Sequence, residues 1–94
     1  MKLVDDNCVL IGRKPVMSYV LACLSLFHAG ATEVSVKARG KAICRAVDVV
    51  EVTRRKFMPD LKVQEIGIGT ELLAIAQDSD ATSNVSTIEI VLAK

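Results

Sequence analysis

The apolar residues of this chain switch repeatedly between two spacings, and this alternation constrains the fold more than any other sequence feature. Short apolar or strictly alternating runs over 8–11, 33–39 and 85–92 predict β-strands. Helical spacing over 15–29 and 41–57 predicts two helices between the strands. The chain is therefore expected to alternate strand and helix along its first two thirds.

The last third of the chain predicts a long β-hairpin. An alternating run over 62–68, continued by the apolar residues 72–75, precedes a polar, turn-forming stretch over 77–84 and the final strand. The order strand, helix, strand, helix, strand, strand predicts an α/β fold of the α+β type, a two-layer sandwich. A chain of 94 residues can bury one core, so we expect a single domain over 1–94.

Glycine and proline residues mark the expected ends of these elements. Pro15 suits the first position of a helix, because its missing N–H would be unpaired there, and Gly30 suits the end of that helix. Gly67 and Gly69 lie inside a strand pattern and not before a helix. They predict a bulge or a close backbone approach rather than a nucleotide-binding loop.

The two predicted helices differ in how much of their surface is apolar. The first is apolar around most of its girth, so we expect it to be largely buried. The second is amphipathic, and Glu51 and Arg55 are four residues apart on its polar side, in the favourable order for an ion pair. Its expected apolar face consists of Ile43, Ala46, Val47, Val50 and Phe57.

The chain lacks the residues that catalysis and metal binding usually need. His28 is the only histidine, and the three cysteines show no C-x-x-C spacing. We therefore expect no enzyme activity, no metal and no cofactor, and we expect the cysteines to be small buried thiols. The apolar run over 16–29 is too short to span a bilayer, which predicts a soluble, cytoplasmic protein without a membrane partner.

Charge is unevenly distributed, although the net charge is only +1. Residues 37–56 hold seven basic residues against two acidic ones, whereas residues 57–94 hold two basic residues against six acidic ones. A basic middle in a nearly neutral chain indicates one positive face that suits a polyanion. An ordinary solvated helix surface with internal ion pairs is the alternative interpretation.

Two groups of cations could form that face. Arg13 and Lys14 lie between a predicted strand and a helix N-terminus, where unpaired N–H groups and a partial positive charge attract phosphate. An ordinary exposed loop is the alternative. The second group pairs residues that share a strand face or a helix face, and the pairs converge if Gly40 alone joins the two elements. It consists of Lys37, Arg39, Lys41 and Arg45.

These same segments resemble the Alba family of archaeal chromatin proteins. The similarity runs in order along nearly the whole chain from Asn7 onward. It is carried by the segments VLIGRKPVMSYV at 9–20, VKARGKAI at 36–43, AVD at 46–48, RKFMP at 55–59 and VSTIEI at 85–90.

The resemblance implies the same order of strands and helices, and a homodimer that coats double-stranded DNA on the chromosome. It places Arg13 and Lys14 in a central phosphate-binding loop, and it makes Phe57 a contact between neighbouring dimers. Lysine acetylation in that loop would fall on Lys14, since Arg13 cannot be acetylated. The basic residues that the resemblance places beside the loop are Arg39, Lys41 and Arg45.

The sequence departs from many relatives at the predicted hairpin tip, where Asp78 and Asp80 stand in place of arginines. Two carboxylates facing phosphates would oppose binding. The basic loop and the group from Lys37 to Arg45, together with the resemblance, still make sequence-independent binding of duplex DNA the leading hypothesis, with two alternatives. One is RNA as the main partner, as in some family members. The other is a specialised paralogue that forms mixed dimers with a more basic Alba protein.

Overall fold

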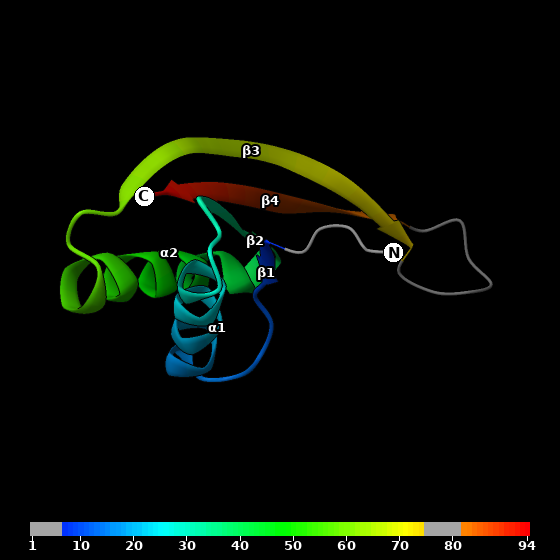
Figure 1. Ribbon diagram of the computed structural model, residues 1–94. Coiled ribbons are helices and arrows are strands. Elements are labelled where there is room, and N and C mark those ends of the chain that lie inside the picture. Colours follow the sequence, from blue (N-terminus) through cyan, green and yellow to red (C-terminus); the bar gives the residue numbers. More distant parts are fainter. Residues whose placement is uncertain (1–6, 75–81) are drawn as a thin grey trace.

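The computed structural model describes residues 7–74 and 82–94, which form one four-stranded sheet with two helices on one side (Figure 1). Asp78 and Asp80 lie outside the described residues. The predicted α+β sandwich and the order of its elements are confirmed. The elements are β1 (Cys8–Leu10), α1 (Val16–His28), β2 (Glu33–Arg39), a 3₁₀ turn (Gly40–Ala42), α2 (Ile43–Val52), a π turn (Thr53–Phe57), β3 (Lys62–Ala74) and β4 (Thr82–Ala93).

The strands lie in the order β1-β2-β4-β3, so the last strand is inserted between the second and the third. β1 and β2 are parallel and are connected through α1, whereas β4 runs antiparallel to both of its neighbours. This order brings β2 close to β3 across a single intervening strand, although more than twenty residues separate them along the chain.

The core lies between the sheet and the two helices. The alternation in β2 points Val34, Val36 and Ala38 toward the helices, and these residues pair with Leu92, Ile90 and Ile88 of β4. The core side chains from the helices are mainly aliphatic, in keeping with the few aromatics in the sequence. The buried helix residues are Val20, Cys23 and Phe27 of α1 and Ala46, Val49 and Val50 of α2.

α1 ends next to Gly30, as the sequence predicted. Gly30 has φ of +109°, which only glycine adopts at little cost, and its N–H donates to the Phe27 carbonyl oxygen at 3.1 Å. The Lys94 ammonium donates to the same oxygen at 3.1 Å. The C-terminal residue therefore supplies a positive charge at the negative end of the helix dipole.

The expectation that α1 is largely buried is wrong for its outer surface. Met17 and Leu21 are four residues apart and are 44% and 56% exposed in the single chain. α1 is covered where it faces the sheet and α2, and a two-layer fold has no third layer to cover its remaining side. The outer side of α1 is thus an apolar surface in the isolated chain.

The expected apolar face of α2 is corrected at two positions. Val47 and Phe57 are 42% and 46% exposed, whereas Val49 and Thr53 are completely buried. The buried positions follow regular helical spacing only as far as Thr53. There the chain enters a π turn in which the Met58 N–H donates to the Thr53 carbonyl oxygen at 2.8 Å. The wider turn rotates Phe57 away from the face that it would occupy in a regular α-helix.

The hairpin is one continuous pair of long strands. Its register shifts between Val63 and Glu65 and not at Gly67 or Gly69, so the prediction of a bulge at these glycines is wrong. The alternative of a close approach fits Gly69, where an added Cβ would lie 3.1 Å from the Thr87 Oγ1 atom. Gly67 has open space above it.

Candidate nucleic-acid interface

The loop between β1 and α1 combines two exposed cations with an open helix N-terminus. Arg13 and Lys14 are both exposed, and α1 begins after Pro15 without a side-chain cap and without an acidic residue in its first turn. Within the described residues, neither cation has a carboxylate partner. Two uncompensated charges therefore stand at the positive end of a helix dipole, which is an arrangement that attracts anions.

Two side chains from the helices hold this loop in place. The Tyr19 hydroxyl accepts hydrogen bonds from the Gly12 N–H at 2.8 Å and from the Lys14 N–H at 3.0 Å. The Arg45 Nη1 atom donates to the Gly12 carbonyl oxygen at 2.6 Å. The loop backbone is thus fixed before any ligand is present.

Sequence reasoning missed Tyr19. The signal that could have found it is the amphipathic nature of tyrosine: a half-buried ring directs its hydroxyl to a polar partner, and the exposed loop five residues earlier offers one. Arg45 was predicted as a phosphate contact, but its guanidinium is directed at the loop backbone. Lys41 lies in the 3₁₀ turn, is exposed, and has no carboxylate partner within the described residues.

Lys37 and Arg39 lie on the opposite side of β2 from its core residues, on the open face of the sheet. Lys37 is 4.0 Å from Glu89 of β4, and Arg39 is 2.9 Å from Glu71 of β3. The predicted convergence of these two cations with Lys41 and Arg45 is therefore wrong. Lys37 and Arg39 alternate along β2 with the buried Val36 and Ala38, so their side chains point away from the helices. Each of the two cations also has a carboxylate partner.

A hollow that is lined in part by this open face contains both pairs. Its lining also includes Gly67 and Gly69, which lack side chains, and Leu10, which is 71% exposed. Because two cations and two carboxylates line it, the hollow carries no excess of positive charge. It is therefore a poorer phosphate site than the loop before α1.

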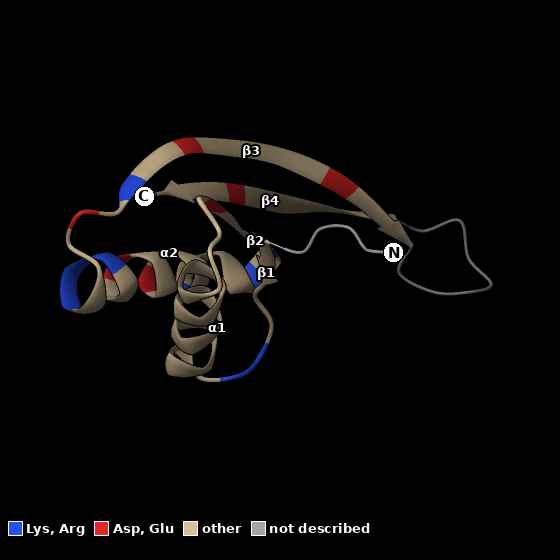
Figure 2. Ribbon diagram, in the orientation of Figure 1, with Lys and Arg blue, Asp and Glu red and all other residues tan. Residues whose placement is uncertain are grey.

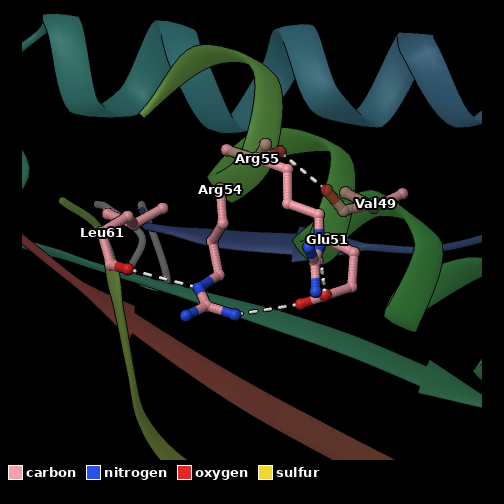
Figure 3. Close-up of polar contacts among 6 residues, drawn as sticks. Val49, Glu51, Arg54, Arg55 and Leu61 are labelled. Carbon is pink, nitrogen blue, oxygen red and sulfur yellow. Dashed lines mark hydrogen bonds and ion pairs between the residues drawn. The ribbon is translucent and has the colours of Figure 1, made fainter. Parts of the chain in front are cut away.

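A second basic region follows α2, where Figure 2 shows Lys and Arg residues in blue in the last turns of the helix. Figure 3 shows Glu51 between two arginines. Arg55 donates to it at 2.8 Å and Arg54 at 3.0 Å, and these bonds lower the pKa of the Glu51 carboxyl below its ordinary value. Arg54 also donates to the Leu61 carbonyl oxygen at 3.2 Å, so the network connects α2 to the chain that leads into β3. Phe57 is held, half exposed, within the turn that this network closes.

The described residues contain no group of three or more His, Cys, Asp and Glu side chains that could hold a metal ion. His28 is exposed at the end of α1. The expectation of buried thiols is correct for Cys23, where burial raises the pKa to about 11. It is wrong for Cys44, which is exposed on α2, and Cys8 is half-buried. In the part of the chain that the structure describes, no helix has the length and apolar character needed to cross a membrane.

Comparison with known proteins decides the family. The model of the Alba family matches residues 7–70, which includes β1, both helices and the loop that carries Arg13 and Lys14. The chain belongs to the Alba family. The resemblance drawn from the sequence motifs is thereby confirmed.

Relatives of this Alba chain match it over nearly its whole length. It is 57% identical over 89 residues to the DNA/RNA-binding protein Alba 1 of Archaeoglobus fulgidus, covering 95% of this chain and 97% of that protein. It is 47% identical over 92 residues to the DNA/RNA-binding protein Alba of Thermoplasma acidophilum, covering 98% and 100%.

Solved structures of the family share the fold. Alba from Thermoplasma volcanium superposes with a TM-score of 0.85 at 49% identity and covers 94% of this chain and 100% of its own. ALBA1 from Trypanosoma brucei superposes with a TM-score of 0.77 at 32% identity, covering 95% of this chain and 69% of its own.

Proposed function

We propose that this Alba chain is a non-enzymatic chromatin protein that binds double-stranded DNA without sequence preference and associates with the chromosome. The observation that carries the proposal is the pair of exposed, uncompensated cations, Arg13 and Lys14, at the uncapped N-terminus of α1. Contacts to phosphates position a protein on DNA without carrying sequence information. The relatives from Archaeoglobus fulgidus and Thermoplasma acidophilum are DNA/RNA-binding proteins, which supports nucleic acid as the ligand class.

The other cations contribute to different degrees. Lys41 is exposed without a carboxylate partner among the described residues, so it adds directly to the positive surface. Arg39 and Lys37 bind phosphate only when they leave Glu71 and Glu89. Arg45 supports the loop. Acetylation of Lys14 would remove one of the two loop charges and weaken binding.

The proposed functional unit is a homodimer. Large apolar side chains at spacings of two and four on β3 are unusually exposed: Ile66 by 59%, Ile68 by 84% and Leu72 by 70%. They lie on β3, an edge strand of the sheet, and pair with Ile90, Ile88 and Asn84 of β4. An exposed apolar strip of this kind is typical of a protein interface, and association with a second copy would remove these side chains from water. Phe57 is the proposed contact between neighbouring dimers.

The test is binding of the dimer to one random-sequence duplex across a series of salt concentrations. Replacing Lys14 with Ala is expected to flatten the slope of log K against log salt by about 0.9, the value for one lost phosphate contact on B-DNA. Lys62→Gln removes one positive charge at the start of β3, away from the loop, and serves as the matched control with an unchanged slope. A slope that Lys14→Ala leaves unchanged would remove the loop from the interface.

RNA is the second candidate, because the same relatives are DNA/RNA-binding proteins. The same cations would serve either ligand, because phosphate binding does not depend on the sugar. Competition between duplex DNA and structured RNA at fixed salt separates the two, and a clear preference for DNA counts against RNA. Weak binding of both ligands by an intact homodimer would favour the mixed dimer with a more basic Alba protein.

A further inference from the structure

The Tyr19 hydroxyl is the acceptor of two backbone hydrogen bonds within a segment of three residues. Its distances to the Gly12 and Lys14 nitrogens are 2.8 and 3.0 Å. A phenol oxygen can accept two hydrogen bonds, so this atom is fully used as an acceptor by the loop. Arg13 lies between the two bonded residues, and its backbone is therefore constrained on both sides.

The ring that carries this hydroxyl is itself anchored. Tyr19 is half-buried and packs against the hydrophobic core from the first turn of α1. The close approach of the hydroxyl depends on the residue opposite it, because a Cβ at Gly12 would lie only 3.2 Å from the Tyr19 oxygen. The glycine thus admits the hydroxyl to the loop backbone, and the core holds the hydroxyl there.

We propose that Tyr19 is a positioning residue of the nucleic-acid site, which holds the 12–14 backbone so that Arg13 and Lys14 are presented together to one stretch of phosphates. This inference rests on the proposed function. Ordering a free backbone costs conformational entropy, and a loop that is ordered in advance avoids that cost on binding. The hydroxyl therefore raises affinity without contributing any charge.

The first test is Tyr19→Phe, which removes only the oxygen. Gly12 and Lys14 are exposed, so water replaces the lost acceptor, and we expect the melting temperature to change little. The amide protons of these two residues should exchange faster with solvent in the free protein. Affinity for a random duplex should fall roughly threefold to tenfold, because two hydrogen bonds are lost and water replaces part of their contribution. The salt slope should stay at the wild-type value, because no cation is lost.

A double-mutant cycle separates positioning from a general structural effect. In a background with Arg13→Ala and Lys14→Ala, the loop has no charges left to position, so Tyr19→Phe should have no further effect on affinity. In the Lys62→Gln background the full effect of Tyr19→Phe should persist. A loss that is the same in all three backgrounds would overturn the proposal.

A second variant approaches the same contact from the loop. Gly12→Ala should weaken binding because the added methyl group displaces the hydroxyl, and it should have no effect in the Tyr19→Phe background, where the oxygen is absent. Equal losses in both backgrounds would contradict the proposed contact.

The outcomes also separate this inference from the proposed function. If Arg13→Ala with Lys14→Ala leaves binding and its salt slope unchanged, the proposed site fails, and the role of Tyr19 fails with it. If those cations matter while Tyr19→Phe leaves affinity and amide exchange at wild-type values, only the positioning role is overturned.

Discussion

The Arg39 guanidinium on β2 lies 2.9 Å from the Glu71 carboxylate on β3, across the intervening strand β4. Both side chains are more than half exposed, so the pair lies at the surface, where water and salt reach it. Glu71 occupies the position on Arg39 that a phosphate oxygen would take. Under the proposed function, the carboxylate would compete with a phosphate for this cation.

Replacing Glu71 with Gln is expected to strengthen duplex binding by up to about fivefold at low salt, because an exposed ion pair contributes about 0.2–1 kcal/mol. The salt slope should become steeper by about 0.9 as Arg39 gains a phosphate contact. Glu65→Gln removes the same charge from the same strand and is the matched control. Fluorescence titration measures the affinity of both variants for the duplex. Equal gains in affinity would indicate a general charge effect and not release of Arg39.

Ile68→Lys is expected to dissociate the proposed dimer. Ile68 is 84% exposed in the single chain, so the change should leave the folded protomer intact, whereas an unpaired ammonium in the interface is costly. The dimer dissociation constant should rise by roughly a hundredfold or more, measured by sedimentation equilibrium. Val47→Lys, at an exposed position of α2, should sediment as the wild type does. A stable Ile68→Lys dimer would place the interface elsewhere.

Phe57→Ala is expected to change assembly along DNA more than folding. Because the ring is 46% exposed, the free energy of unfolding should fall by about 1 kcal/mol at most. Cooperative binding to a long duplex should weaken, while affinity for a duplex that accommodates one dimer should not change. The short duplex is the internal control. Loss of affinity on both duplexes would make Phe57 part of the DNA contact.

The thiols should differ in reactivity. Burial raises the pKa of Cys23 from 9.0 to about 11, so at pH 8 roughly one thiol in a thousand is the reactive thiolate. A thiol reagent should modify exposed Cys44 promptly and Cys23 only on unfolding. Rapid labelling of Cys23 in the native protein, located by mass spectrometry, would contradict its burial.

The same shift predicts a pH dependence of stability. Well below pH 9 the Cys23 thiol is neutral in both the folded and the unfolded chain, so its ionisation does not change the free energy of unfolding. Between pH 9 and 11 the unfolded chain loses this proton first, and the free energy of unfolding should fall. Thermal melts of Cys23→Ala should show a shallower decline over this interval. Identical declines would assign the pH effect to other groups.

Local periodicity was enough to predict the order of the elements and the position of the loop cations. β2 spans the residues that its alternation predicted, and the glycine expected to end α1 does so. The predicted pair of Glu51 and Arg55 is present for the same reason, since residues four apart on a helix are always neighbours. Such features depend on contacts within a few residues, which a single sequence shows directly.

Contacts between distant segments could not be predicted in this way. Arg45 and Gly12 are 33 residues apart, and Arg39 and Glu71 are 32 apart. The partner of each cation follows from the insertion of β4 between β2 and β3 and from the packing of α2 beside the loop. Because the sequence does not show these contacts, it predicted that Lys37 and Arg39 converge with Lys41 and Arg45, whereas the structure separates the strand pair from the other two.

The sequence by itself determined the family, the alternation of strands and helices, and the two charges at the start of α1, because each is written in neighbouring residues. The tertiary structure decided which cations are free, which are paired, and that Tyr19 and Arg45 hold the loop. It also decided that Phe57 and Cys44 are exposed. These properties depend on which surfaces the strand order and the π turn bring together, and no local pattern specifies that arrangement.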